Sequence, residues 1–224
     1  MYTPAAYAHT DLAALHDDIE AWSFATLVSV GPEGPTATHL PFLLDRSVRQ
    51  PDTANELPAQ GLLTTHMARA NPQWHTLLSG EPCLVIFQGP HAFISPSWYK
   101  NQQTFPTWNY TAIHVRGIPT VIEDPSRIRD VLDRTVARYD TPLQGNWRFP
   151  DMPQALTQSR LSAIVAVDIP IARIEGKMKL NQDKSVDDRR GVVRALLASG
   201  DPQSAAVARM ILQQQDMKTF SVQS

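Results

Sequence analysis

Residues 24–44 read FATLVSVGPEGPTATHLPFLL, two apolar segments on either side of a turn. Residues 24–30 and 36–44 have the composition of strands, and the glycines and prolines of 31–35 suit a hairpin turn. Pro41 has no N–H to donate to a ladder, so it marks an edge, a bulge or the point where the strand leaves its sheet. The segment therefore predicts an antiparallel hairpin near the start of the chain.

Further strands and helices follow in an irregular order. Apolar residues three or four apart predict a helix over 12–22, and the polar composition of 46–60 predicts a mobile loop. Further strands are predicted over 62–66, 83–88, 91–94, 109–121 and 163–169. Three pairs of a capping residue and a proline predict helix starts at Asn71-Pro72, Asp124-Pro125 and Asp201-Pro202.

This order is neither a regular β-α-β alternation nor a series of evenly spaced strands, so it favours an α+β barrel. We expect a barrel domain with inserted helices over residues 1–170. Residues 171–224 turn helical, and we expect them to form a C-terminal loop and helical segment packed on the barrel or on a partner subunit.

Composition argues against several classes of protein. Hydrophobic residues make up 42% of the 224 residues, enough for a core, and the net charge of −2 gives no general attraction to nucleic acid. DNA binding is possible but is supported by neither charge nor a helix-turn-helix motif. The N-terminus lacks the features of a signal peptide, and no run of about 18 apolar residues occurs. The chain is therefore expected to be cytoplasmic, with no membrane association.

The residues that usually carry catalysis or metal binding form no recognisable pattern. The single cysteine, Cys83, lies in an apolar run where a small buried thiol is expected, and one cysteine cannot form a disulfide within a chain. The seven histidines show no metal-ligand spacing, and the Walker loop and the GxGxxG, GxSxG and HExxH motifs are missing. No metal site and no catalytic residue are assigned from the sequence.

Residues 64–72, TTHMARANP, run from a strand end into a predicted helix start. Free backbone N–H groups at a helix start favour a phosphate, and Arg69 could add a charge-assisted contact beside His66. The alternative interpretation is that Arg69 is a solvated loop residue and that His66 only satisfies its own hydrogen bonds.

Two other segments could contribute to a binding site. Residues 88–99, QGPHAFISPSWY, and 106–110, PTWNY, mix aromatic rings with hydroxyl and amide groups, as a flavin ring requires. Packing in a core or a dimer interface uses the same aromatic residues, so both interpretations stay open. Residues 175–184, EGKMKLNQDK, are either a solvated loop or, if extended, a strand that points Lys177 and Lys179 the same way.

Together these segments resemble the PaiB family, FMN-binding proteins described as negative transcriptional regulators. The matching stretches are spread over nearly the whole chain, at 24–29, 37–41, 66–74, 87–99, 106–117 and 175–189. The resemblance implies a pyridoxamine-phosphate-oxidase-like fold, an FMN-binding split β-barrel with peripheral helices. It also implies a homodimer that holds FMN at the subunit interface.

Carried onto this chain, the resemblance implies a phosphate cradle near Arg69 and a flavin wall in the aromatic segments. The candidate cofactor-binding residues are Thr38, His39, His66, Met67, Ala68, Arg69, Asn71, Ser95, Trp98, Tyr99, Trp108, Asn109, Tyr110, Lys177, Lys179 and Gln182. The chain departs from the family pattern at three places. Where tyrosine, tryptophan and a serine-glutamine-asparagine run are expected, it has Phe93, Met178 and Asn181-Gln182-Asp183.

Three functions are compatible with these features. The first is an FMN-binding protein that acts as a transcriptional regulator or as a low-turnover flavin oxidoreductase, with the chemistry belonging to the flavin. The second is a flavin-free protein that represses transcription, directly or indirectly. The third is a haem-binding split-barrel protein.

Overall fold

The computed structural model describes residues 1–47 and 59–214, and internal contacts divide the protein into two compact units. The first unit comprises residues 1–11, 88–113 and 175 onward, and the second comprises 12–87 and 114–174. Most of the loop predicted over 46–60 lies outside the described residues. The predicted domain boundary near residue 170 stays a prediction.

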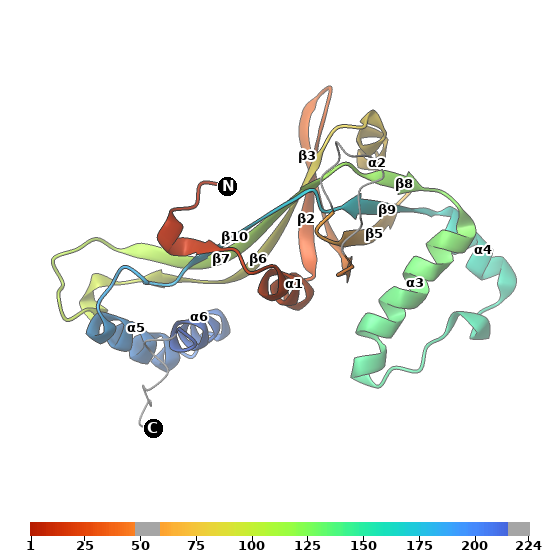
Figure 1. Ribbon diagram of the computed structural model, residues 1–224. Coiled ribbons are helices and arrows are strands. Elements are labelled where there is room, and N and C mark those ends of the chain that lie inside the picture. Colours follow the sequence, from red (N-terminus) through yellow and green to blue (C-terminus); the bar gives the residue numbers. More distant parts are fainter. Residues whose placement is uncertain (48–58, 215–224) are drawn as a thin grey trace. The chain divides into compact units, whose positions relative to one another are not determined.

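The elements of each unit are shown in Figure 1. The second unit contains α1 (Leu12–Ala21), β2 (Phe24–Gly31), β3 (Gly34–Pro41), β4 (Leu43–Asp45), β5 (Leu62–Ala68), α2 (Gln73–Thr76), β8 (Thr120–Ile122), α3 (Pro125–Tyr139), α4 (Gln154–Ser162) and β9 (Ile164–Pro170). The first unit contains β1 (Ala8–His9), α5 (Val186–Ala198) and α6 (Pro202–Leu212). Three strands contribute residues to both units, namely β6 (Cys83–Ile94), β7 (Thr107–Gly117) and β10 (Arg173–Lys179). Short 3₁₀ turns are η1 (Ala5–Tyr7), η2 (Leu77–Ser79), η3 (Pro96–Trp98), η4 (Thr141–Leu143) and η5 (Phe149–Asp151).

The predicted hairpin is present in the second unit. Strands β2 and β3 pair antiparallel from Phe24 opposite Pro41 to Gly31 opposite Gly34, and β2 also pairs with β6. Gly34 has a φ of +106°, a conformation that glycine adopts without the strain of a Cβ. Strand β3 ends at Pro41, and β4 already pairs with β5 in a second sheet. Of the three alternatives for Pro41, the structure shows that the strand leaves its sheet there, and β3 is also an edge strand.

The second sheet of this unit has the strand order β4-β5-β9-β8. Helix α3 packs Ile128 and Val131 against Ala166 of β9. The Asp124 carboxylate accepts hydrogen bonds from the backbone N–H groups of Ser126 and Arg127, so the predicted N-cap is confirmed. These contacts anchor the start of α3 beside the sheet.

The strands of the first unit follow the order β1-β10-β7-β6. Helices α5 and α6 lie side by side (blue in Figure 1) and cover one face of these strands. The core between helices and strands is formed by Ala92, Ile94, Tyr99, Leu180, Val192, Val193, Leu196, Val207, Ala208 and Ile211. Helices α5 and α6 pack on this face only, so they do not cover the opposite face of the same strands.

Three expectations about element boundaries were wrong. The single strand predicted over 109–121 is two strands, β7 and β8, which belong to different sheets. Residues 83–88 and 91–94 form one continuous strand, β6, which runs through Pro90. The strand can continue there because a proline lacks only the N–H donor and keeps its carbonyl acceptor. The Pro90 carbonyl still accepts a hydrogen bond from the Thr111 hydroxyl, at 3.2 Å. Residues 173–179 form strand β10 before the helices begin, because they pair with β1.

Helix α5 approaches the backbone of the 3₁₀ turn η3 very closely at Gly191. A Cβ on this residue would lie 2.0 Å from the Trp98 carbonyl oxygen, so only glycine fits. Gly191→Ala should therefore destabilise the protein by about 1–3 kcal/mol. Helix propensity alone predicts the opposite sign, a gain of about 1 kcal/mol.

Urea unfolding followed by far-UV circular dichroism measures this difference. Arg194→Ala, at an exposed position of the same helix, is the matched control and should change the free energy of unfolding by less than about 0.5 kcal/mol. A Gly191→Ala protein more stable than the original chain would contradict the close packing of α5.

Candidate functional site

The predicted cofactor-binding residues are divided between the two units. The second unit holds Thr38, His39, His66, Met67, Ala68, Arg69 and Asn71. The first unit holds Ser95, Trp98, Tyr99, Trp108, Asn109, Tyr110, Lys177, Lys179 and Gln182. The two groups are therefore considered separately.

Arg69, the cation of the predicted phosphate cradle, is held by protein groups. Its Nη1 donates to Glu123 Oε2 at 2.6 Å, its Nε to the Ser162 carbonyl at 3.1 Å, and its Nη2 to the Ile164 carbonyl at 3.4 Å. The guanidinium also lies over the Trp74 ring, 5.7 Å from its centroid. In this arrangement Arg69 ties the end of β5 to the segments that flank β9.

The neighbouring predicted residues are also occupied by local contacts. Asn71 donates from Nδ2 to Thr38 Oγ1 at 2.9 Å, and its Oδ1 accepts the Gln73 N–H at 3.0 Å. His39 Nδ1 and Thr26 Oγ1 are 2.9 Å apart. Burial lowers the pKa of His66 below its usual value, which favours the neutral ring. The structure thus links Asn71 with Thr38, while the role of this group in phosphate binding stays a prediction.

In the first unit, the predicted aromatic cluster is divided between two faces of the sheet. Successive side chains of a strand point to opposite faces, so Trp108 and Tyr110 share one face of β7 while Asn109 lies on the other. Tyr99 and Trp98 also belong to the helix side, where Tyr99 is in the core and Trp98 packs against it. The residues of the predicted flavin wall therefore do not all share one face of the sheet.

The face away from the helices carries a group of aromatic side chains and one lysine, which we call the aromatic face. It consists of His91, Phe93, Trp108, Tyr110 and Lys177. The Trp108 ring centroid lies 5.9 Å from that of Phe93 and 6.2 Å from that of His91. Trp108 is 54% exposed and Phe93 46% exposed, so flat apolar surface is open on this face.

Lys177 is the charged member of the aromatic face and is only 8% exposed. Its Nζ donates to the Tyr2 carbonyl at 3.1 Å and lies 5.6 Å and 5.1 Å from the ring centroids of Tyr2 and Tyr110. Among the described residues it forms no ion pair. A buried ammonium has three donor hydrogens and a large desolvation cost, so this position favours an additional acceptor or anion. The Nδ1 of His91, on the same face, is a buried polar atom without a hydrogen-bond partner in the described structure.

The opposite face holds a buried polar network that orders the loop after β10. Asn181 donates from Nδ2 to Tyr99 Oη at 2.6 Å, and its Oδ1 accepts a hydrogen bond from Asn109 Nδ2. Asn181 has a φ of +61°, which asparagine tolerates better than most residues. The network serves the helix side of the strands, away from Trp108. Asn181 was noted in the sequence only as part of a departure from the family pattern.

The remaining predicted residues make local contacts. Gln182 Nε2 donates to the Met178 carbonyl at 2.5 Å and its Oε1 accepts the Leu180 N–H. This side chain therefore bonds to the backbone just before it in the chain. Lys179 Nζ donates to Thr107 Oγ1. The Ser95 hydroxyl accepts the Ser97 N–H at the start of η3.

The three departures from the family pattern have different structural consequences. Phe93 lies on the aromatic face beside Trp108, where tyrosine would have added a hydroxyl. Met178 packs against the core under the helices, on the other face. Partial burial tends to raise the pKa of Asp183, but hydrogen bonding and the charge of Lys184 lower it below its usual value. Only Phe93 therefore changes the chemistry of the aromatic face itself.

Neither cysteine chemistry nor a metal centre is indicated. Cys83 is 3% exposed, and burial raises the pKa of its thiol to about 12, so the reactive thiolate is scarce near neutral pH. Over residues 1–47 and 59–214, no group of three or more His, Cys, Asp or Glu side chains is placed to hold a metal ion. The structural reading of Cys83 as a buried thiol is confirmed.

The sequence comparison identifies the family. Residues 1–173 match the family described as "Putative FMN-binding domain", and the chain belongs to that family. The protease synthase and sporulation protein PAI 2 of Bacillus subtilis is 30% identical over 211 residues, which cover 94% of this chain and 96% of that protein. An uncharacterized protein of Aspergillus fumigatus is 26% identical over 260 residues, which cover 97% of this chain and 99% of that protein. The resemblance to the PaiB family is confirmed.

Solved structures support the fold. The FAD and heme binding protein of Mycobacterium smegmatis superposes with a TM-score of 0.54 at 18% identity, over 87% of this chain and 80% of that one. The flavocytochrome Anf3 of Azotobacter vinelandii superposes with a TM-score of 0.53 at 12% identity, over 77% of this chain and 69% of that one. The α+β split-barrel fold predicted from the sequence is confirmed.

The family defines the cofactor, so this chain is a PaiB-like flavin-binding protein and its cofactor is FMN. The family match does not say which residues hold the flavin. No helix in the described part of the chain has the length and apolar character that a membrane span requires.

Asn181→Ala should destabilise the protein by about 1–3 kcal/mol, because Tyr99 and Asn109 lose a buried hydrogen-bond partner. Asn181→Gly removes the same side chain but tolerates the positive φ, so it should be less destabilised than the alanine variant. Urea unfolding of both variants checks the order of stabilities. An alanine variant as stable as the original chain would show that the network contributes little.

Proposed function

We propose that the FMN of this protein lies against the aromatic face of the first unit. The observation that carries the proposal is Lys177, a cation that is 8% exposed, beside two tyrosine rings and without an ion pair among the described residues. An oxygen atom of FMN would supply the missing acceptor for its ammonium group. The open ring surfaces of Trp108 and Phe93 would contact the flavin.

Electrostatics favours this assignment over the cradle predicted at the end of β5. A buried charge without an ion pair costs several kcal/mol, and an additional ligand acceptor at Lys177 relieves part of that cost. Arg69, in contrast, already has hydrogen bonds from Nε and both Nη atoms and a carboxylate 2.6 Å away. A phosphate at Arg69 would have to displace Glu123, whereas a ligand at Lys177 displaces no carboxylate.

FMN, when bound, supplies the redox chemistry. The protein groups on the aromatic face would orient the ring and donate hydrogen bonds, and we assign no residue a catalytic role. We infer that the protein acts as a regulator or as a low-turnover flavin oxidoreductase. The name of the Bacillus subtilis relative, protease synthase and sporulation protein PAI 2, supports the regulatory role.

Direct DNA binding receives little support from the structure. Of the arginines that cluster in α5, Arg189 is 5% exposed and donates to Gln214, and Arg190 lies 3.6 Å from Asp187. These side chains are engaged within the protein. We therefore favour a regulatory role in which FMN occupancy changes contacts with another protein. A cytoplasmic location stays a prediction from the sequence.

Binding of FMN to variants of the aromatic face tests the proposal. Lys177→Met should weaken FMN binding about 10- to 100-fold, because a charged hydrogen bond is worth about 1.5–3 kcal/mol. Isothermal titration calorimetry gives the dissociation constant and should show one FMN per subunit. Trp108→Ala should weaken binding as well, through the loss of ring contact.

Lys100→Met is the matched control, since this lysine of the same unit is 79% exposed, and its FMN affinity should stay unchanged. Circular dichroism verifies that each variant is folded. Unchanged affinity in a folded Lys177→Met protein, with a loss in Arg69→Gln, would move the site to the cradle predicted from the sequence.

We also propose that the protein is a homodimer in which a second copy covers part of the aromatic face and its bound flavin. Exposed rings such as Trp108 and Phe93 are unfavourable in water, and association removes them from it. Sedimentation velocity should give a species of twice 24.9 kDa. Trp108→Asp should shift it towards the monomer. A monomer at every concentration of the unaltered protein would contradict the dimer.

A further inference from the structure

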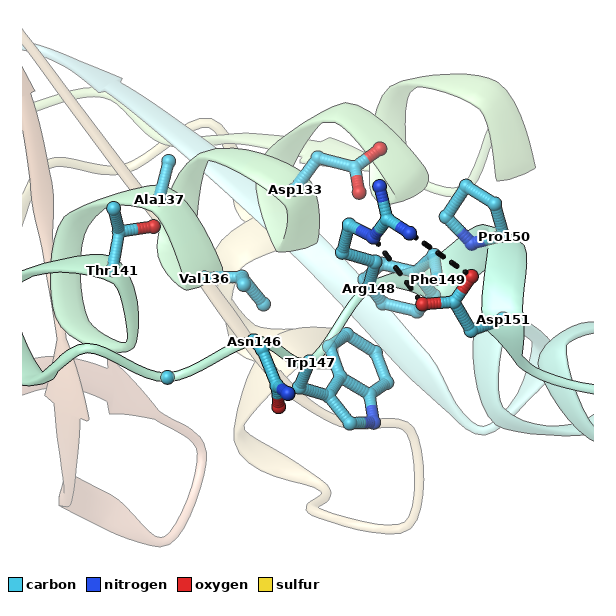
Figure 2. A pocket seen from close by; sticks show the side chains of 11 residues that line it. Asp133, Val136, Ala137, Thr141, Asn146, Trp147, Arg148, Phe149, Pro150 and Asp151 are labelled. Atoms are coloured by element: carbon cyan, nitrogen blue, oxygen red, sulfur yellow. Dashed lines mark hydrogen bonds and ion pairs between the residues drawn. The ribbon is translucent and has the colours of Figure 1, made fainter.

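A pocket of about 640 Å³ lies in the second unit, and none of the predicted cofactor-binding residues lines it. Helix α3 forms one wall with Asp133 and Val136, and the segment after α3 forms the other with Asn146 and Trp147 (Figure 2). Its volume falls in the range of sites that take small molecules, about 300–1,000 Å³. The pocket is therefore separate in sequence and composition from the aromatic face.

Backbone hydrogen bonds hold the loop that forms the pocket wall. The N–H groups of Leu143 and Gly145 donate to the Asp140 carbonyl, both at 3.0 Å, and the Gln144 N–H donates to the Thr141 carbonyl at 3.0 Å. A Cβ on Gly145 would lie 2.1 Å from the Asp140 carboxyl group, so a side chain at this position would require the Asp140 carboxyl group to move. The wall is thus formed before any ligand arrives.

Aromatic rings make up the floor of the pocket. Trp147 and Phe149 meet edge to face, with ring centroids 4.5 Å apart and an angle of 76° between the planes. The guanidinium carbon of Arg129 lies over the Phe149 ring, 4.3 Å from its centroid, in a cation–π contact that helps to hold this ring in place. Trp147 keeps 40% of its surface exposed, so part of the indole remains available to another flat molecule.

The charges around the pocket neutralise one another. Asp133 accepts from Arg129 Nε at 2.9 Å, and Asp151 accepts from Arg148 Nε at 3.2 Å. Each of these two lining carboxylates therefore has its own cation, and the lining residues offer no unpaired carboxylate to an ionic ligand. A neutral ligand fits this balance better than an anion or a cation.

Two polar side chains at the pocket have no partners of their own. Thr141 and Asn146 line the pocket, and neither side chain makes a hydrogen bond among the described residues (Figure 2). A hydroxyl and an amide together provide both donors and acceptors. They suit a ligand that carries an amide or a similar polar group.

We propose that this pocket binds a small, neutral, planar aromatic molecule that carries an amide group. The ring lies against the indole of Trp147 and the Val136 side chain. The amide of the ligand exchanges hydrogen bonds with Asn146 and Thr141. This site is distinct from the proposed FMN site and does not depend on it.

Fluorine NMR of the full chain, labelled with 5-fluorotryptophan, tests the proposal with nicotinamide as the probe. The five tryptophan resonances are assigned by substituting each residue in turn. We expect nicotinamide to shift the Trp147 resonance in a saturable way, with a dissociation constant of about 1 mM or tighter. Cyclohexanecarboxamide, which has the same amide on a non-aromatic ring, should cause no comparable shift.

Variants separate binding in the pocket from binding elsewhere. In ligand-observed NMR, Trp147→Ala should weaken nicotinamide binding at least about tenfold. Phe105→Ala removes an aromatic ring that is 87% exposed in the first unit and should leave the affinity unchanged. The proposal is overturned if Trp147 shows no saturable shift, if the two carboxamides act equally, or if a folded Trp147→Ala protein keeps its affinity.

Discussion

The first unit depends on one constraint, the alternation of side chains along β6, β7 and β10 with only one face covered by helices. Ile94 and Leu180 pack with Val192 of α5 on the covered face. A shift of one residue in a strand would move its apolar side chains out of this core, so burial fixes the register. Once it is fixed, Trp108 must lie on the opposite face, away from α5 and α6.

The buried ammonium of Lys177 follows from the same constraint. Strand β10 alternates, so Met178 enters the core and Lys177 lies across from it, between the rings of Tyr2 and Tyr110. Ring faces partly compensate a cation through their quadrupoles, but they do not replace a charged acceptor. This incomplete compensation is the feature that distinguishes the aromatic face from ordinary packing of aromatic residues. Because the cofactor of the family is FMN, the charge of Lys177 makes the aromatic face the first place to test for flavin binding.

Arg69 shows that a local motif does not reveal the partners that the fold gives to a side chain. In the sequence, an arginine before a helix start has the features of an anion site. In the structure its partners come from 54 to 95 residues away along the chain, at Glu123, Ser162 and Ile164. No periodicity or capping pattern reports such distant partners. Alternation along β7, in contrast, was available in the sequence and would have separated Asn109 from Trp108.

The sequence by itself determined the features that depend on neighbouring residues. These include the hairpin over 24–44, the Asp124 cap of α3 and the motifs that identify the family and its FMN. The tertiary structure decided which side chains share a face, the continuation of β6 through Pro90, and the pocket beside Trp147. The physical reason is range: turns, caps and periodicity act over a few residues, whereas burial, ion pairing and cavities depend on segments brought together only by the fold.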